Sequence, residues 1–79
     1  MPVPLSYRGI AADITARIRS GEYSPGARLP SYAELAEIYS VSVSTAQRGI
    51  GLLQDRGLVV GSQGRGLYVA DDAPAKLGL

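Results

Sequence analysis

The chain has 79 residues, of which 46% are hydrophobic and 19% are charged, and its formal net charge is +1. This composition is typical of one small globular domain and excludes an intrinsically disordered chain. Cysteine and histidine are absent, which excludes a disulfide scaffold and the usual zinc sites. No apolar run approaches the roughly 20 residues that span a bilayer, and the first residues do not resemble a signal peptide. We therefore expect a soluble protein of the cytoplasm that has no membrane partner.

The charges are unevenly distributed along the chain. Five of the seven acidic residues precede Arg56, the other two are Asp71 and Asp72, and residues 56–70 contain none. A locally basic edge on an almost neutral domain is compatible with a nucleic-acid partner, although many ordinary surfaces share this pattern.

The first predicted helix covers residues 6–20. Its isoleucines recur every four residues, at Ile10, Ile14 and Ile18, which places them on one face. Gly21 follows directly and is a candidate for a left-handed residue that ends the helix.

A second predicted helix covers residues 31–40. It is preceded by turn residues at Pro25 and Gly26 and by a very short candidate strand at residues 27–29. Ser31 and Glu34 have the spacing of a capping box, in which each side chain satisfies the backbone donor of the other residue.

The third predicted helix covers residues 42–56, with Ser42 as its first capping residue and Gly57 as its stop. Winding it at 100° per residue separates an apolar face, which carries Ala46, Ile50 and Leu53, from a polar face. Its glycines divide in the same way. Gly49 lies on the inner side, where a missing side chain allows close helix packing, and Gly51 lies outward.

Residues 58–70 change to a β pattern, in which two antiparallel strands are joined by a glycine-rich turn at residues 61–66. We expect residues 1–70 to form the domain and residues 71–79 to be a flexible tail. The fold class is therefore mostly α with a small β-hairpin: a winged helix-turn-helix of three helices plus a two-stranded wing. The expected core comprises Ile10, Ile14, Ile18, Leu29, Leu35, Ala36, Ala46, Ile50, Leu53, Leu58 and Val69.

The polar face of the third helix is the candidate functional surface, because a recognition helix meets base edges with its N-terminal half. The amide of Gln47 suits adenine, Ser44 and Thr45 suit a phosphate or a base, and Arg48 suits a phosphate or guanine. Arg65 in the wing suits a phosphate or the minor groove. The full candidate DNA-binding set is Ser31, Tyr32, Ser42, Ser44, Thr45, Gln47, Arg48, Gln63, Gly64 and Arg65, and Arg28 and Arg56 are secondary candidates.

Several of these residues have a structural explanation as well. Ser31 and Ser42 need no role beyond helix capping. Tyr32 can reach a phosphate or simply pack, and a polar residue in an exposed loop or on an outward helix face is often only solvated.

The stretches "YRGIAADITARIRSGEYSPGARLPS", "ELAEIYSVS", "LLQDRGLV" and "GSQGRGLYV" resemble the DNA-binding domain of the GntR family of bacterial transcription regulators, over Tyr7 to Ala70. The resemblance implies sequence-specific binding to a double-stranded DNA operator by a nucleoid-associated protein of the bacterial cytoplasm. It also implies a repressor. Because one short recognition helix has too small a footprint for tight binding alone, we expect the chain to be a monomer or weak dimer in solution and to pair as a homodimer on DNA, and we expect no cofactor.

The chain departs from the family pattern at three positions. Family members resemble one another in arginines at the positions of Ala33, Val43 and Gln47, so the guanine-reading pattern of the family is not carried over. The family also has a C-terminal domain that binds a small effector, and we expect none in this chain.

Two other function classes are open to such a domain. A winged helix can serve as a protein-interaction module, which the near-neutral charge and the missing arginines favour. An enzyme is not expected, because the sequence has no histidine, no cysteine and no clustered carboxylates.

Overall fold

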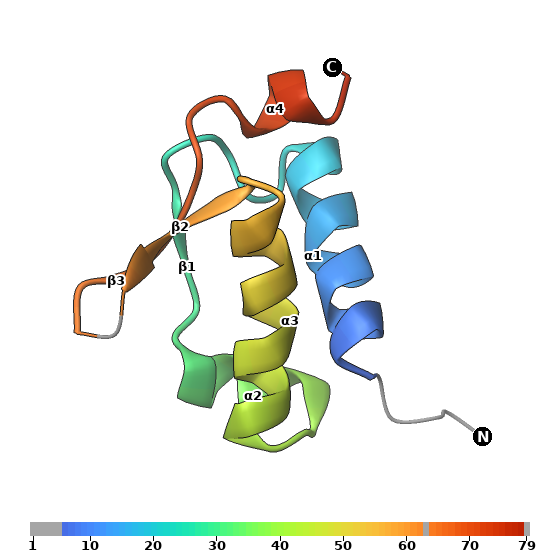
Figure 1. Ribbon diagram of the computed structural model, residues 1–79, viewed down its shortest axis with the longest axis vertical. Coiled ribbons are helices and arrows are strands. Elements are labelled where there is room, and N and C mark those ends of the chain that lie inside the picture. The colour runs from blue at the N-terminus through green and yellow to red at the C-terminus, as the bar shows by residue number, and fades with distance from the viewer. Residues whose placement is uncertain (1–5, 63, 79) are drawn as a thin grey trace.

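The computed structural model describes residues 6–62 and 64–78. In chain order the elements are α1 (Tyr7–Ser20), β1 (Arg28–Leu29), α2 (Tyr32–Tyr39), α3 (Val43–Asp55), β2 (Val59–Ser62), β3 (Gly66–Val69) and α4 (Ala73–Lys76). Figure 1 shows α3 at the centre, with α1 along one side and the sheet on the other, α2 across its N-terminal end and α4 beyond its C-terminal end. The predicted winged helix-turn-helix is confirmed. No helix in the described ranges is both long and apolar enough to span a membrane.

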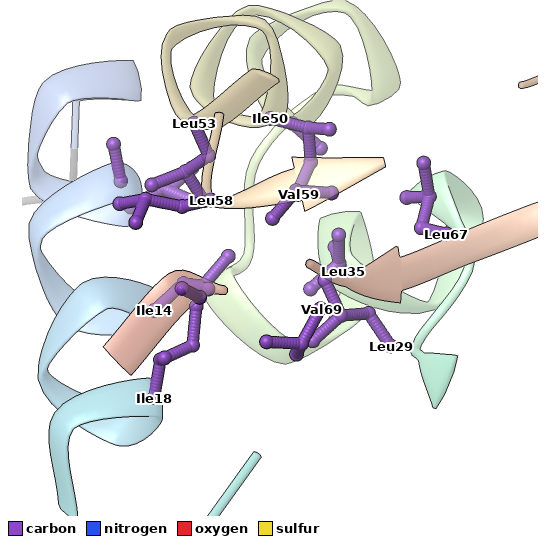
Figure 2. Packing of buried hydrophobic residues seen from close by; sticks show 14 of the residues in the cluster. Ile14, Ile18, Leu29, Leu35, Ile50, Leu53, Leu58, Val59, Leu67 and Val69 are labelled. Atoms are coloured by element: carbon purple, nitrogen blue, oxygen red, sulfur yellow. The ribbon is translucent and has the colours of Figure 1, made fainter. Parts of the chain in front are cut away.

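The core forms where α1, α2, α3 and the sheet meet. Figure 2 shows their apolar side chains converging on one interior. Every residue that the sequence predicts for the core is buried, because the helical and strand periodicities select one face of each element. The structure adds further buried residues, namely Ala11, Val59, Leu67, Ala70 and Ala73.

The sheet has three antiparallel strands in the order β1-β3-β2, so the expected two-stranded wing gains a third strand. The candidate strand after Gly26 pairs with β3, which places Leu29 opposite Leu67. Both leucines are buried, so their packing holds the base of the wing against the helices. The turn is shorter than predicted, because Gly61 and Gly66 lie within β2 and β3.

The C-terminal segment differs from the flexible tail that the sequence predicts. Residues 73–76 form α4, whose Ala73 is fully buried and which packs against α1. Pro74 is tolerated because it lies in the first turn of the helix, where its missing N–H has no partner to lose. The Lys76 ammonium donates to the carbonyl of Gly57 at 3.2 Å, which fixes the segment beside the end of α3.

Gly49 sets the distance between α1 and α3. A methyl group at this position would lie 3.0 Å from the carbonyl oxygen of Tyr7 and 3.1 Å from Cγ2 of Ile10. Gly51 lies on the opposite side of α3, where a methyl group would meet no atom of the described residues within 4 Å. A side chain at position 49 would therefore force its neighbours on α1 to shift slightly, whereas one at position 51 would not.

These two glycines make a matched pair for a stability test. Gly51→Ala should raise the free energy of unfolding by about 0.5–1 kcal/mol, because alanine loses less backbone entropy in a helix. Gly49→Ala gains the same propensity but must displace α1, and it should lower the free energy of unfolding by about 1–3 kcal/mol. Urea unfolding of both variants measures the difference, and equal stabilities would contradict the packing assigned to Gly49.

A hydrogen-bonded cluster ties α2 to α1. The Asp13 carboxylate accepts from the Tyr39 hydroxyl at 2.7 Å and from Nε of Arg17 at 2.9 Å. Arg17 also donates to Glu22 at 2.6 Å. The bond from Tyr39, and then the bond and positive charge of Arg17, lower the pKa of Asp13 below its ordinary value.

The lowered pKa of Asp13 makes this tie pH-dependent. Its stabilisation is complete above the unfolded-state pKa of Asp13 and is lost as the pH falls through the folded-state pKa. Tyr39→Phe should lower the free energy of unfolding by about 1 kcal/mol at neutral pH, and the deficit should shrink in acid below about pH 4. Tyr23→Phe is the control, because that ring is half-buried and its hydroxyl does not bond Asp13. A deficit independent of pH would contradict the linkage.

Candidate nucleic-acid interface

The burial of one face of α3 determines what its other face presents. Ala46, Gly49, Ile50 and Leu53 are buried, and α3 packs against α1, α2 and β2. The opposite face, which carries Ser44, Gln47 and Arg48, is exposed. The predicted division of this helix into an apolar and a polar face is confirmed.

An open groove of about 390 Å³ lies between the first turns of α2 and α3 and the wing, and we call it the wing groove. It combines elements that are far apart in the sequence. Four predicted site residues line it, namely Ser31, Tyr32, Gln47 and Gly64. The remaining lining residues are Arg28, Ala33, Val43, Gly66 and Leu67.

At three positions this chain lacks an arginine that similar sequences have. All three positions line the wing groove. Ala33 comes from the first turn of α2, and Val43 and Gln47 come from α3. Their side chains carry no charge, so this wall of the groove offers one amide and two apolar groups.

Arg28 is the charged residue among those that line the wing groove. Its Nε lies 3.2 Å from the position that a Cβ on Gly66 would occupy, so its guanidinium crosses from β1 to the base of the wing. The sequence predicts Arg28 only as a secondary candidate, because the strand that pairs with a two-residue strand cannot be inferred from its sequence. Arg56, the other secondary candidate, caps the far end of α3 and lies away from the groove.

Ser31 forms the predicted capping box. Its hydroxyl accepts from the backbone N–H of Glu34 at 3.2 Å, and the Glu34 carboxylate accepts from the N–H of Ser31 at 3.0 Å. The bonds from Ser31, together with the nearby charge of Arg28, hold the pKa of Glu34 below its ordinary value. The box fixes the first turn of α2 where Tyr32 and Ala33 enter the groove.

The first turn of α3 carries a cluster of hydroxyl groups. Ser42 caps the helix by accepting from the N–H of Thr45 at 3.2 Å. Its hydroxyl also lies 3.2 Å from the hydroxyl of Ser44 and 2.9 Å from that of Thr45. These groups surround the N-terminus of a helix, where the backbone favours an anion.

Arg48 points toward α1 and does not line the wing groove. Its guanidinium carbon lies 5.1 Å from the centre of the Tyr7 ring, and that of Arg8 lies 5.9 Å from the same ring. Both distances are within the range of cation–π attraction. Tyr7 and Arg8 were absent from the predicted set, because their approach to Arg48 depends on the close packing of α1 and α3 at Gly49.

The wing contributes exposed residues at its tip. Gly64 has a φ of +94°, a conformation that favours glycine. Arg65 is exposed, and its carbonyl oxygen accepts from the Tyr68 hydroxyl at 3.3 Å. The remaining predicted wing residue, Gln63, lies outside the described residues.

Comparisons with known proteins agree on one family. The model of the gntR family of bacterial regulatory proteins matches residues 6–69. The chain is 39% identical over 70 residues to the histidine utilization repressor of Klebsiella aerogenes, and this match covers 89% of the chain and 29% of the repressor. The chain thus spans less than a third of the length of that relative.

Solved structures support the same conclusion. A GntR family transcriptional regulator from Listeria monocytogenes superposes with a TM-score of 0.84 at 30% identity, over 91% of this chain and 65% of that one. BusR of S. agalactiae, solved in complex with its busAB-promotor DNA, gives a TM-score of 0.79 at 28% identity, over 95% of this chain and 37% of that one.

Within the hydroxyl cluster of α3, the contribution of the capping residue to stability can be measured apart from that of its neighbour. Ser42→Ala removes the cap and should lower the free energy of unfolding by about 1 kcal/mol. Ser44→Ala removes an exposed hydroxyl that does not cap the helix and should change it by less than about 0.5 kcal/mol. Thermal unfolding of both variants measures the effect, and a larger loss for Ser44→Ala would reverse the assignment.

Proposed function

Because this chain belongs to the GntR family of bacterial regulatory proteins, we propose that it is the sequence-specific DNA-binding domain of a transcriptional regulator. The observation that carries the proposal is the wing groove, in which an outward helix face, a capped helix start and a wing come together. The likeness to BusR, which was solved with promoter DNA, supports the choice of a DNA partner.

In this proposal α3 enters the major groove of the duplex. A groove of about 12 Å admits one α-helix, and the residues near the helix start meet the base edges. Gln47 is exposed and lines the wing groove. Its amide both donates and accepts, as bidentate pairing with adenine requires. Gln47 is therefore the proposed base reader.

Phosphate contacts position the helix on the duplex. The proposed contacts from the helices are Ser31, Tyr32, Ser42, Ser44 and Thr45, because hydroxyl groups and helix N-termini bind phosphate oxygens. The wing, through Gln63, Gly64 and Arg65, is proposed to lie on the backbone or in the minor groove.

Arg48 is proposed to bind a phosphate rather than a base. It lies outside the wing groove, and Tyr7 holds it beside Arg8 at the edge between α1 and α3. Two arginines near the same tyrosine ring form a positively charged site that suits the phosphates of the DNA strand beside the major groove.

Two copies are proposed to bind together, on a palindromic or direct-repeat operator. One short recognition helix has too small a footprint for tight binding by itself. The proposed outcome is repression, supported by the similarity to the histidine utilization repressor. The site of action is the nucleoid of the bacterial cytoplasm.

A protein-interaction module is the second candidate function. It is favoured by the net charge of +1 and by the uncharged groove wall at Ala33, Val43 and Gln47. Mobility-shift measurements with genomic fragments at two salt concentrations distinguish the two. Binding that persists for some fragments at the higher salt supports the DNA-binding proposal, and no binding at low salt supports the alternative.

Gln47→Ala tests the base reader. Duplexes are first selected on the wild-type protein from a random library, and affinities for a selected and a scrambled duplex are then measured by fluorescence anisotropy. The variant should lose about 1–3 kcal/mol of preference at one base pair while keeping the salt dependence of binding. Equal weakening toward both duplexes would show that Gln47 does not read a base.

Arg65→Ala tests the wing. Few cations are available, so the slope of log affinity against log salt should be about −2 to −4 per bound copy in the wild-type protein. The variant should bind every duplex more weakly, with a slope reduced in magnitude by about one. Arg56→Ala removes an exposed cation at the far end of α3 and is the matched control. If both variants have the wild-type slope, the wing does not contact a phosphate.

A further inference from the structure

Val43 is an exposed valine at the start of α3. The residue is 45% exposed, although an isopropyl group gains from burial. The other large apolar residues that are strongly exposed in the described ranges are Ile38, at 57%, and Val60, at 52%. Neither of these lines the wing groove, whereas Val43 does.

Val43 and Gln47 face the same space. They lie four residues apart on α3, so one turn of helix places them on the same face. The rise between them is about 6 Å. Since successive base pairs of DNA are about 3.4 Å apart, the two side chains reach base pairs no more than about two steps apart.

On the side of α2, the wing groove is lined by Ala33 together with Ser31 and Tyr32, which carry hydroxyl groups. Ala33 lines the same groove from the first turn of α2, and the charged lining residue, Arg28, packs against Gly66 of the wing. At these three positions, the groove presents two apolar groups, at Val43 and Ala33, and one amide, at Gln47. A polar base edge pressed against the apolar part would lose its hydrogen bonds with water.

We propose that Val43, which lines the same groove as Ala33, is a specificity-determining residue that contacts the methyl group of a thymine in the major groove. Thymine is the base that presents a methyl group there, and apolar side chains recognise it. Together with an adenine contact at Gln47, this makes the operator rich in A·T pairs beneath the start of α3. The inference rests on the proposed DNA-binding function and adds to it the chemistry that is read.

The test removes the methyl group of the thymine in one experiment and the methyl groups of Val43 in another. Duplexes are selected on the wild-type protein from a random library, and each thymine of the selected sequence is replaced in turn by deoxyuridine, which lacks only the methyl group. Wild-type binding should weaken about threefold to tenfold at one thymine of each half-site, as expected for one buried methyl group. Val43→Ala should bind the thymine and deoxyuridine duplexes within twofold of each other.

Val60→Ala is the matched control, because it removes the same atoms from a similarly exposed valine outside the wing groove. It should keep the full sensitivity of the wild-type protein to deoxyuridine. The melting temperatures of both variants show whether a loss of binding reflects unfolding.

The possible failures are distinguishable. Selective binding that tolerates deoxyuridine at every thymine overturns the inference and leaves the proposed function standing. Equal sensitivity of Val43→Ala and the wild-type protein also overturns it, because another residue then reads the methyl group. Failure to bind any duplex at low salt removes the proposed function and this inference with it.

Discussion

The close approach of α1 to α3 at Gly49 is the constraint on which the rest of the surface depends. The Tyr7 carbonyl and the Ile10 side chain occupy the space that a side chain at position 49 would need. The face of α3 that carries Gly49 is buried, and Gln47 and Arg48 lie on the exposed face. The packing of α1 against α3 also brings the Tyr7 ring beside Arg48, next to the face that is proposed to read bases.

Separate local interactions hold the two walls of the wing groove in place. Tyr39 and Asp13 tie α2 to α1, and the capping box at Ser31 sets its first turn. On the other side, the buried pair Leu29 and Leu67 holds the base of the wing. Each of these walls is thus anchored in the core or by hydrogen bonds.

The sequence predicts features that depend on local spacing. The isoleucines of α1 recur every four residues, and Ser31 with Glu34 forms the predicted capping box, since both patterns involve neighbours within one helical turn. Of the candidate site, Ser31, Tyr32, Gln47 and Gly64 come together as lining residues of one groove. Whether they contact DNA remains a prediction.

Other features depend on neighbours that are distant in the sequence. Ala73 is buried because the chain returns to α1, which the composition of residues 71–79 does not indicate. Arg28 reaches the wing because β1 pairs with β3, and a two-residue strand carries no signal of its partner. The guanidinium of Arg48 lies near the ring of Tyr7, a residue on another helix. Helical periodicity therefore predicts the face on which Arg48 lies but not the direction of its side chain.

The central claim, that the wing groove is the DNA-binding surface, is tested most directly by nuclear magnetic resonance. Backbone amide shifts of the isotope-labelled protein are followed during titration with a duplex selected on the same protein. We expect the largest shift changes at the amides of Ala33, Val43, Gln47 and Gly64, and almost no change at the amides of α4. Largest changes at α4 or at Val60, with Val43 and Gln47 unaffected, would contradict it.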